Sequence, residues 1–171
     1  MFGPNSAQGK RRGVDLKHSY QVAIQWQGNR GTGTSDYRSY GREHIVSAAG
    51  KHEIEGSADR AFRGDTSRWN PEELLLAALS QCHLLSYLHV AASHGVVVTA
   101  YTDSATGIME QTGDGGGHFL SATLHPVVTI AGGEAEAALA ASLHAEASAK
   151  CFIAASVNFP VEHEPTTIPL S

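Results

Sequence analysis

Apolar and polar residues alternate along several stretches of the chain. In residues 18–26, HSYQVAIQW, the alternation is that of a half-buried β-strand, and the turn-forming sequence GNRGTG leads from it into a second predicted strand at 32–37. These two strands predict a hairpin near the N-terminus. Further strands are predicted at 43–48, 96–111, 119–130 and 156–162.

The longest apolar stretch, NPEELLLAALSQCHLLSYLHVAASHG at 70–95, predicts one long helix. Asn70 suits the N-cap, Pro71 the first helical position, and Glu73 the returning side chain of a capping box. Gly95 suits the left-handed residue that ends a helix. A second helix is predicted from about Glu134, so the order of elements indicates an α+β fold with local antiparallel hairpins.

The composition is typical of one globular domain. With 171 residues and 42% hydrophobic content, the chain is long enough for a single core, which we assign to residues 14–171 after a Gly- and Lys/Arg-rich tail at 1–13. A net charge of −5 argues against nucleic acid or an anionic membrane as a partner. The N-terminus lacks the apolar core of a secretory signal, and polar residues interrupt the apolar helix. We therefore expect a cytoplasmic protein that does not span a membrane.

Two patterns that can mark cofactor sites do not fit one in this sequence. The segment TGDGGGH at 112–118 joins two predicted strands and lacks the lysine of a phosphate-binding loop, which favours a flexible hairpin tip. Among the ten histidines, His83 and His89 are six residues apart and point to different faces of the long helix. A zinc site that uses His125, His144 or the segment 162–164 is the weaker alternative, because no ligand spacing supports it. We expect neither a resident metal nor a cofactor.

The two cysteines occupy different kinds of position. Cys82 lies inside the apolar helix, where most cysteines are inert small hydrophobic residues, and Cys151 follows the second helix. One thiol in a central helix and another at a helix exit is also the arrangement that a peroxidatic and a resolving cysteine need. A thiol among apolar side chains needs a nearby cation to ionise. The chain offers four arginines in the first turn and before the helix: Arg30, Arg60, Arg63 and Arg68.

The sequence Asn70-Pro71-Glu72-Glu73-Leu74, with Cys82 ten residues after Glu72, resembles the signature of the OsmC/Ohr family of organic hydroperoxide reductases. The resemblance covers most of the chain from about residue 18. Three segments further resemble a less characterised OsmC-like branch: TSDYRSYGREH, AFRGD and KCFIAASVNFPV.

The resemblance implies an intertwined homodimer whose two central helices lie between the sheets and whose active sites use both chains. In this pattern Cys82 matches the peroxidatic cysteine, Cys151 the resolving cysteine and Glu72 the signature glutamate. The activating arginine is either Arg63, before the signature, or Arg30, in the first hairpin turn, and the spacing favours Arg63. Because Glu72 lies about 15 Å from Cys82 along the helix, we expect it to act from the partner chain or through a bridging arginine.

The implied activity is that of a peroxiredoxin-type thiol peroxidase. Cys82 would attack an organic hydroperoxide and release the alcohol, and its sulfenic acid would condense with Cys151 to a disulfide. An external dithiol, or a lipoylated protein, would then reduce the disulfide. Phe152 follows Cys151 where the family commonly has proline. Two alternatives stay open on the same fold: a non-catalytic module that binds a lipid or small molecule, and a redox sensor.

Overall fold

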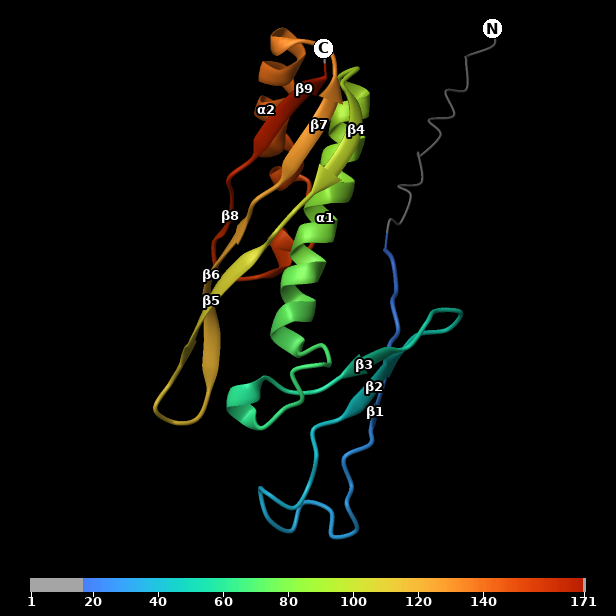
Figure 1. Ribbon diagram of the computed structural model, residues 1–171, viewed down its shortest axis with the longest axis vertical. Coiled ribbons are helices and arrows are strands. Elements are labelled where there is room, and N and C mark those ends of the chain that lie inside the picture. The colour runs from blue at the N-terminus through green and yellow to red at the C-terminus, as the bar shows by residue number, and fades with distance from the viewer. Residues whose placement is uncertain (1–16, 171) are drawn as a thin grey trace, which may run out of the picture.

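The computed structural model describes residues 17–170, which form two long helices and three small sheets (Figure 1). The predicted tail at 1–13 lies outside the described residues. Two short 3₁₀ turns, η1 (Arg60–Phe62) and η2 (Ala154–Ser156), accompany the helices α1 (Pro71–Ser93) and α2 (Glu134–Ala149). The strands are β1 (Ala23–Trp26), β2 (His44–Ser47), β3 (Ile54–Gly56), β4 (Val97–Thr102), β5 (Thr106–Gln111), β6 (Gly117–Leu124), β7 (Val127–Ala131), β8 (Val161–His163) and β9 (Thr166–Leu170).

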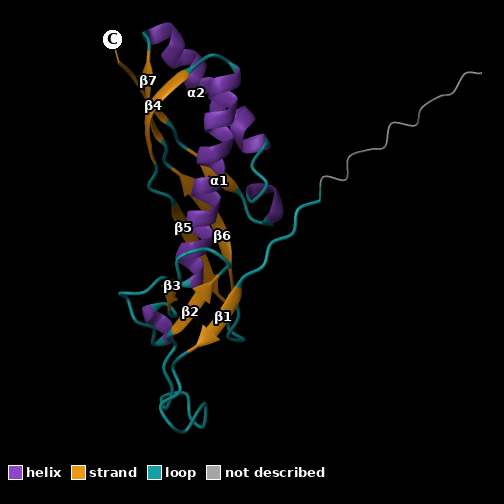
Figure 2. Cartoon of the chain, turned by 90° about the vertical axis from the view of Figure 1, so that its right-hand side faces the viewer, coloured by secondary structure: helices purple, strands orange, loops and turns teal. Residues whose placement is uncertain are grey.

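Each sheet has three strands, in the orders β1-β2-β3, β4-β7-β9 and β5-β6-β8. Strands close in sequence pair antiparallel, whereas β8 and β9 add in parallel to β6 and β7. The predicted α+β class is therefore confirmed. The β1-β2-β3 sheet lies at the N-terminal end of α1, and α2 lies beside the C-terminal half of α1 (Figure 1, Figure 2).

The main core lies between the two helices and the β4-β7-β9 sheet. Tyr87, Val90 and Ala91 of α1 pack with Val128 and Ile130 of β7 in one buried cluster. Helix α2 adds small residues to the same cluster, Ala137, Ala140 and Ala147, together with Leu143. Their size leaves room for the large aromatic ring of Tyr87 between the helices.

Helix α1 begins and ends where the sequence predicts. The Asn70 side chain accepts a hydrogen bond from the Glu73 N–H at 2.7 Å, and the Glu73 carboxylate accepts one from the Asn70 N–H at 3.2 Å. Gly95 follows the helix with a φ of 76°. By length and apolar composition α1 would suffice to cross a membrane, but only 28% of its most apolar stretch is buried within the described residues. Much of its apolar surface therefore lacks cover in a single chain.

The predicted strands at 96–111 and 119–130 each break into two. Between β4 and β5, the Asp103 carboxylate accepts hydrogen bonds from the His125 backbone N–H at 2.7 Å and from the Ser80 hydroxyl at 2.5 Å. Pro126, between β6 and β7, has no N–H to donate to a sheet. The contact of Asp103 with α1 is long-range in sequence, so periodicity could not reveal this break.

The prediction of a strand at 32–37 is wrong, because these residues form turns. The Asn29 side chain accepts hydrogen bonds from two backbone N–H groups of the loop, at 3.0 and 3.1 Å. Farther along, the Arg42 guanidinium lies 4.3 Å from the Tyr37 ring centroid and 4.1 Å from that of Tyr40. These contacts order the long loop, and β1 pairs with β2 beyond it.

The C-terminal segment also differs from its prediction. The strand predicted at 156–162 starts later, at Val161, because residues 154–156 form the turn η2. Strands β3 and β9 were not predicted. Both are short edge strands whose pairing partners, β2 and β7, hold them in place.

Candidate active site

Cys82 and Cys151 lie together at the interface between α1 and α2. Cys82 is half-buried on α1, and Cys151, just after α2, is 2% exposed. Both are free thiols, and Cys82 lies close enough to Cys151 to raise the pKa of its thiol. Two thiols in contact from separate elements can form a disulfide without large backbone movement.

The environment of Cys151 keeps it protonated. Burial, with the neighbouring Cys82 thiol adding to it, raises the pKa of the Cys151 thiol to about 11. The Ala154 N–H donates to the Cys151 sulfur at 3.4 Å and acts in the opposite direction. A protonated, enclosed thiol is a weak nucleophile, so Cys151 is suited to react second.

A pocket of about 760 Å³ opens beside Cys82. Its wall is mainly apolar, and large side chains from three parts of the chain contribute to it: Tyr20, Leu85, Phe152 and Ile153. Lys150 and His89 are the ionisable groups at this wall besides Cys82 and Tyr20. The half-buried thiol can therefore be reached by a small molecule with an apolar body.

Glu72 does not lie at the cysteine pair of its own chain. It lines a different pocket of about 350 Å³, near the start of α1, together with Phe62, Met109 and Phe119. Its Oε2 atom is buried and has no hydrogen-bond partner among the described residues. A buried carboxylate oxygen without a donor is costly, so this position suits a partner that the single chain does not supply.

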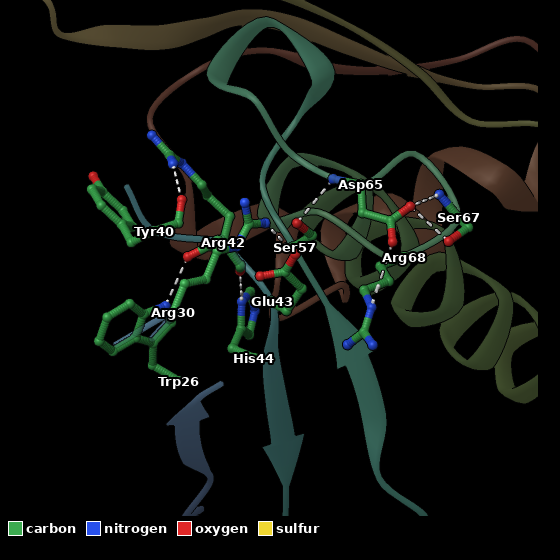
Figure 3. Close-up of polar contacts among 11 residues, drawn as sticks. Trp26, Arg30, Tyr40, Arg42, Glu43, His44, Ser57, Asp65, Ser67 and Arg68 are labelled. Carbon is green, nitrogen blue, oxygen red and sulfur yellow. Dashed lines mark hydrogen bonds and ion pairs between the residues drawn. The ribbon is translucent and has the colours of Figure 1, made fainter. Parts of the chain in front are cut away.

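Neither Arg30 nor Arg63 lines the pocket at Cys82. Arg30 is exposed in the loop between β1 and β2, where its guanidinium lies 3.5 Å from the Glu43 carboxylate (Figure 3). Arg63 is exposed at the end of η1, with a left-handed φ of 66° that is uncommon for residues other than glycine. The segments that carry these arginines, the β1–β2 loop and the turn after β3, lie at the β1-β2-β3 end of the molecule (Figure 1).

The other two candidate arginines also lie before α1. Arg60 opens η1. The Arg68 guanidinium lies 3.9 Å from Glu55 and 3.8 Å from Asp65, and its Nη1 is buried without a partner among the described residues (Figure 3). These contacts hold the loop that precedes the helix.

Three features of the site are not predicted by the sequence. Tyr20 and Lys150 reach the Cys82 pocket, and the buried side chains of His83 and His144 are hydrogen-bonded to each other between α1 and α2. Of these features, only the presence of Lys150 at the pocket has a signal in the sequence, because Lys150 directly precedes Cys151. Within residues 17–170, no group of three or more His, Cys, Asp or Glu is arranged to hold a metal.

The match to a known family agrees with this arrangement. The family described as OsmC-like protein matches residues 64–166, which include α1 and both cysteines. The chain belongs to the OsmC-like family. Solved structures extend the similarity beyond the matched segment. An OsmC-like protein of unknown function from Vibrio cholerae is 28% identical with a TM-score of 0.78, and the match covers 87% of this chain and 99% of that chain.

Two organic hydroperoxide resistance proteins share the OsmC-like fold. The protein from Elizabethkingia anophelis is 21% identical with a TM-score of 0.63, covering 91% of this chain and 100% of that one. The protein from Legionella pneumophila is 20% identical with a TM-score of 0.64, covering 89% of this chain and 99% of that one. No curated protein sequence shows a significant match.

Proposed function

We propose that this OsmC-like protein is a thiol-dependent peroxidase that reduces organic hydroperoxides to alcohols. The neighbouring free thiols of Cys82 and Cys151, with Cys82 at the wall of an apolar pocket, are the observation that carries the proposal. Membership of the OsmC-like family supports it, as do the names of two structural relatives as organic hydroperoxide resistance proteins.

The proposed cycle has three steps. The Cys82 thiolate attacks the distal peroxide oxygen, the O–O bond breaks, and the alkoxide leaves as the alcohol after taking up a proton. The Cys151 thiol then attacks the Cys82 sulfenic acid, and the hydroxyl group leaves with the thiol proton as water. An external dithiol reduces the resulting disulfide by two exchanges and is itself oxidised to a disulfide.

The pocket favours hydroperoxides that carry an apolar group. Leu85, Phe152 and Ile153 present hydrocarbon to whatever lies beside the sulfur of Cys82. Contact with this surface stabilises a bound alkyl or aryl group, whereas hydrogen peroxide has no apolar group that could be stabilised in the same way. We therefore propose a preference for organic over hydrogen peroxide.

The proposal includes a homodimer in which the partner completes the site. Leu85 of α1 and Phe152 are 65% and 78% exposed, and Tyr20 is 91% exposed, so the pocket is lined by exposed apolar side chains. An exposed surface of this kind is typical of an interface. A second chain would cover it and bring its own Glu72, with Arg63 or Arg30, toward Cys82 as the carboxylate and the cation that the thiolate needs.

The proposal is tested by peroxide consumption. Purified protein is supplied with a dithiol reductant and either cumene hydroperoxide or hydrogen peroxide, beside its Cys82→Ser variant. We expect repeated turnover that is faster with cumene hydroperoxide and absent in the variant. A protein that consumes neither peroxide, with Cys82 still reduced, would refute peroxidase activity. The pocket would then favour the ligand-binding alternative, whereas one round of oxidation without turnover would favour a redox sensor.

A further inference from the structure

A pair of buried histidines lies at the same helix interface as the cysteines. The His83 Nε2 and His144 Nδ1 atoms are 3.0 Å apart, joining α1 to α2, and the two residues are 2% and 1% exposed. The rings are stacked with centroids 5.3 Å apart. The His144 ring also stacks on Tyr87, whose hydroxyl donates to the Ala140 carbonyl at 3.0 Å.

The two bonded imidazole rings are neutral at neutral pH. Burial lowers the pKa of His83 to about 4 and that of His144 to about 3, so both are uncharged at neutral pH. A neutral imidazole offers one donor and one acceptor, which is what a single bond between two rings needs. A bond buried on both sides has no competing water, and its loss leaves an unpaired polar atom in the core.

The bond and the cysteine pair are neighbouring contacts of one interface. His83 directly follows Cys82 on α1, and Cys151 lies seven residues after His144, two residues past the last residue of α2, Ala149. A rotation or slide of α2 against α1 that broke the imidazole bond would also move Cys151 away from Cys82.

We propose that the His83–His144 hydrogen bond positions Cys151 for disulfide formation by holding α2 in the register in which its thiol faces Cys82. His83 and His144 are positioning residues, because neither lines the pocket at Cys82. The inference rests on the proposed peroxidase cycle only for the sulfenic acid step. It predicts that loss of the bond slows disulfide formation and leaves the attack of Cys82 on peroxide unchanged.

The test uses matched variants of the full chain. His83→Gln places a side-chain amide near the position of Nε2 and keeps the bond, whereas His83→Asn is chemically alike but too short to reach His144. His144→Leu removes the bond from the other helix. His163→Leu is the control, since its ring lies 5.4 Å and 6.1 Å from the rings of His83 and His144 without a hydrogen bond to either.

Each variant receives one equivalent of cumene hydroperoxide, and sulfenic acid and disulfide are followed by dimedone trapping and mass spectrometry. We expect sulfenic acid formation within about twofold of wild type throughout, and disulfide formation slowed at least about tenfold in His83→Asn and His144→Leu, since small misplacement of reacting groups has large kinetic effects. His83→Gln and His163→Leu should stay close to wild type. Equal disulfide rates in His83→Gln and His83→Asn would overturn the proposal.

A second oxidant separates this inference from the peroxidase proposal. Diamide converts two neighbouring thiols to a disulfide, and is itself reduced to the hydrazine, without any peroxide step. If wild type forms no sulfenic acid with peroxide, the peroxidase proposal fails, while the diamide rates of the same variants still decide the positioning role. A His83→Asn chain that forms the disulfide with diamide as fast as His83→Gln would contradict that role independently.

Discussion

At the scale of single residues, two touching thiols have different environments. Cys151 is almost fully enclosed, and burial raises the pKa of its thiol to about 11. Cys82 is half-buried and opens on the pocket. Access and ionisation together decide which thiol meets a reagent first.

The two cysteines should therefore differ in alkylation rate. We expect iodoacetamide at pH 8 to modify Cys82 at least about tenfold faster than Cys151, because the thiolate is the reacting form and Cys151 ionises only near pH 11. Peptide mass spectrometry of timed samples gives both rates. Alkylation of unfolded protein in urea is the control, in which the two rates should converge. Faster labelling of Cys151 in the native protein would contradict the assignment.

The buried histidines predict a loss of stability in acid. The folded pKa values of His83 (about 4) and His144 (about 3) lie below the ordinary histidine pKa of 6.5. Below pH 6.5 these two histidines are therefore protonated in the unfolded chain but remain neutral in the native chain, which favours unfolding. The contribution of the neutral histidines to the free energy of unfolding is complete above pH 6.5 and is lost as the pH falls toward 4. Besides His144 on α2, the ionisable groups that act on His83 from other parts of the chain are His163, which adds to the lowering of its pKa, and Asp103, which opposes it.

We expect the free energy of unfolding to fall by on the order of 6 kcal/mol between pH 7 and pH 4 through this pair, with about half from each histidine. Urea denaturation at several pH values measures the slope. Carboxylates titrate in the same range, so the matched measurement is the double variant His83→Gln, His144→Asn, which should lose less stability over this interval. An unchanged slope in the double variant would show that the imidazoles do not carry the effect.

At the scale of elements, α1 is the part of the fold that local sequence specifies best. Its N-cap, first-turn proline, capping box and terminal glycine are all present where predicted. Each of these signals acts within four residues, so none depends on the rest of the chain. The strand breaks and the β1–β2 loop depend on Asp103, Arg42 and their distant or stacked partners, and were predicted poorly for that reason.

The cap itself can be tested. Asn70→Ala removes the acceptor of the Glu73 N–H, and we expect it to lower the free energy of unfolding by about 1 kcal/mol. Urea unfolding followed by circular dichroism provides the measurement. Asn70→Asp keeps an acceptor oxygen and should stay close to wild type. Equal losses in both variants would mean that the side-chain hydrogen bond is not what stabilises the helix start.

At the scale of the whole molecule, one chain leaves its site incomplete. Among the residues that the structure describes, much of the apolar surface of α1 is uncovered, a buried Glu72 oxygen has no hydrogen-bond donor, and the candidate arginines do not line the Cys82 pocket. A second copy of the chain could cover α1, supply a donor to Glu72 and bring an arginine to the Cys82 pocket. We therefore propose that the active form is a homodimer with shared sites.

Mixing variants tests whether the sites are shared. Cys82→Ser and Glu72→Gln proteins should each be inactive or strongly impaired alone. If Glu72 acts on the partner's Cys82, exchange of chains between the two variants restores about one quarter of the wild-type sites, because half of the dimers are mixed and each has one intact site. Peroxide consumption by the mixture after partial unfolding and refolding gives the result.

Two controls complete that experiment. The mass in solution of wild type and of both variants should be twice 18.1 kDa. A mixture of Cys82→Ser with wild type should gain no activity beyond the wild-type share. Dimeric mixtures with no recovered activity would place Glu72 and Cys82 in the same chain's site and refute the shared arrangement.

The sequence by itself determined the helices, the α+β class and the two cysteines as candidates, because caps, periodicity and the OsmC-like signature are written in short stretches of chain. Only the tertiary structure decided that Cys82 touches Cys151, that Cys151 is enclosed, and that His83 and His144 are bonded between the helices. Residues 61 or 69 positions apart in the chain meet because α1 and α2 pack on one sheet. The local sequence pattern does not reveal such contacts, because the packing of the two helices depends on the apolar surface that both helices and their sheet bury together.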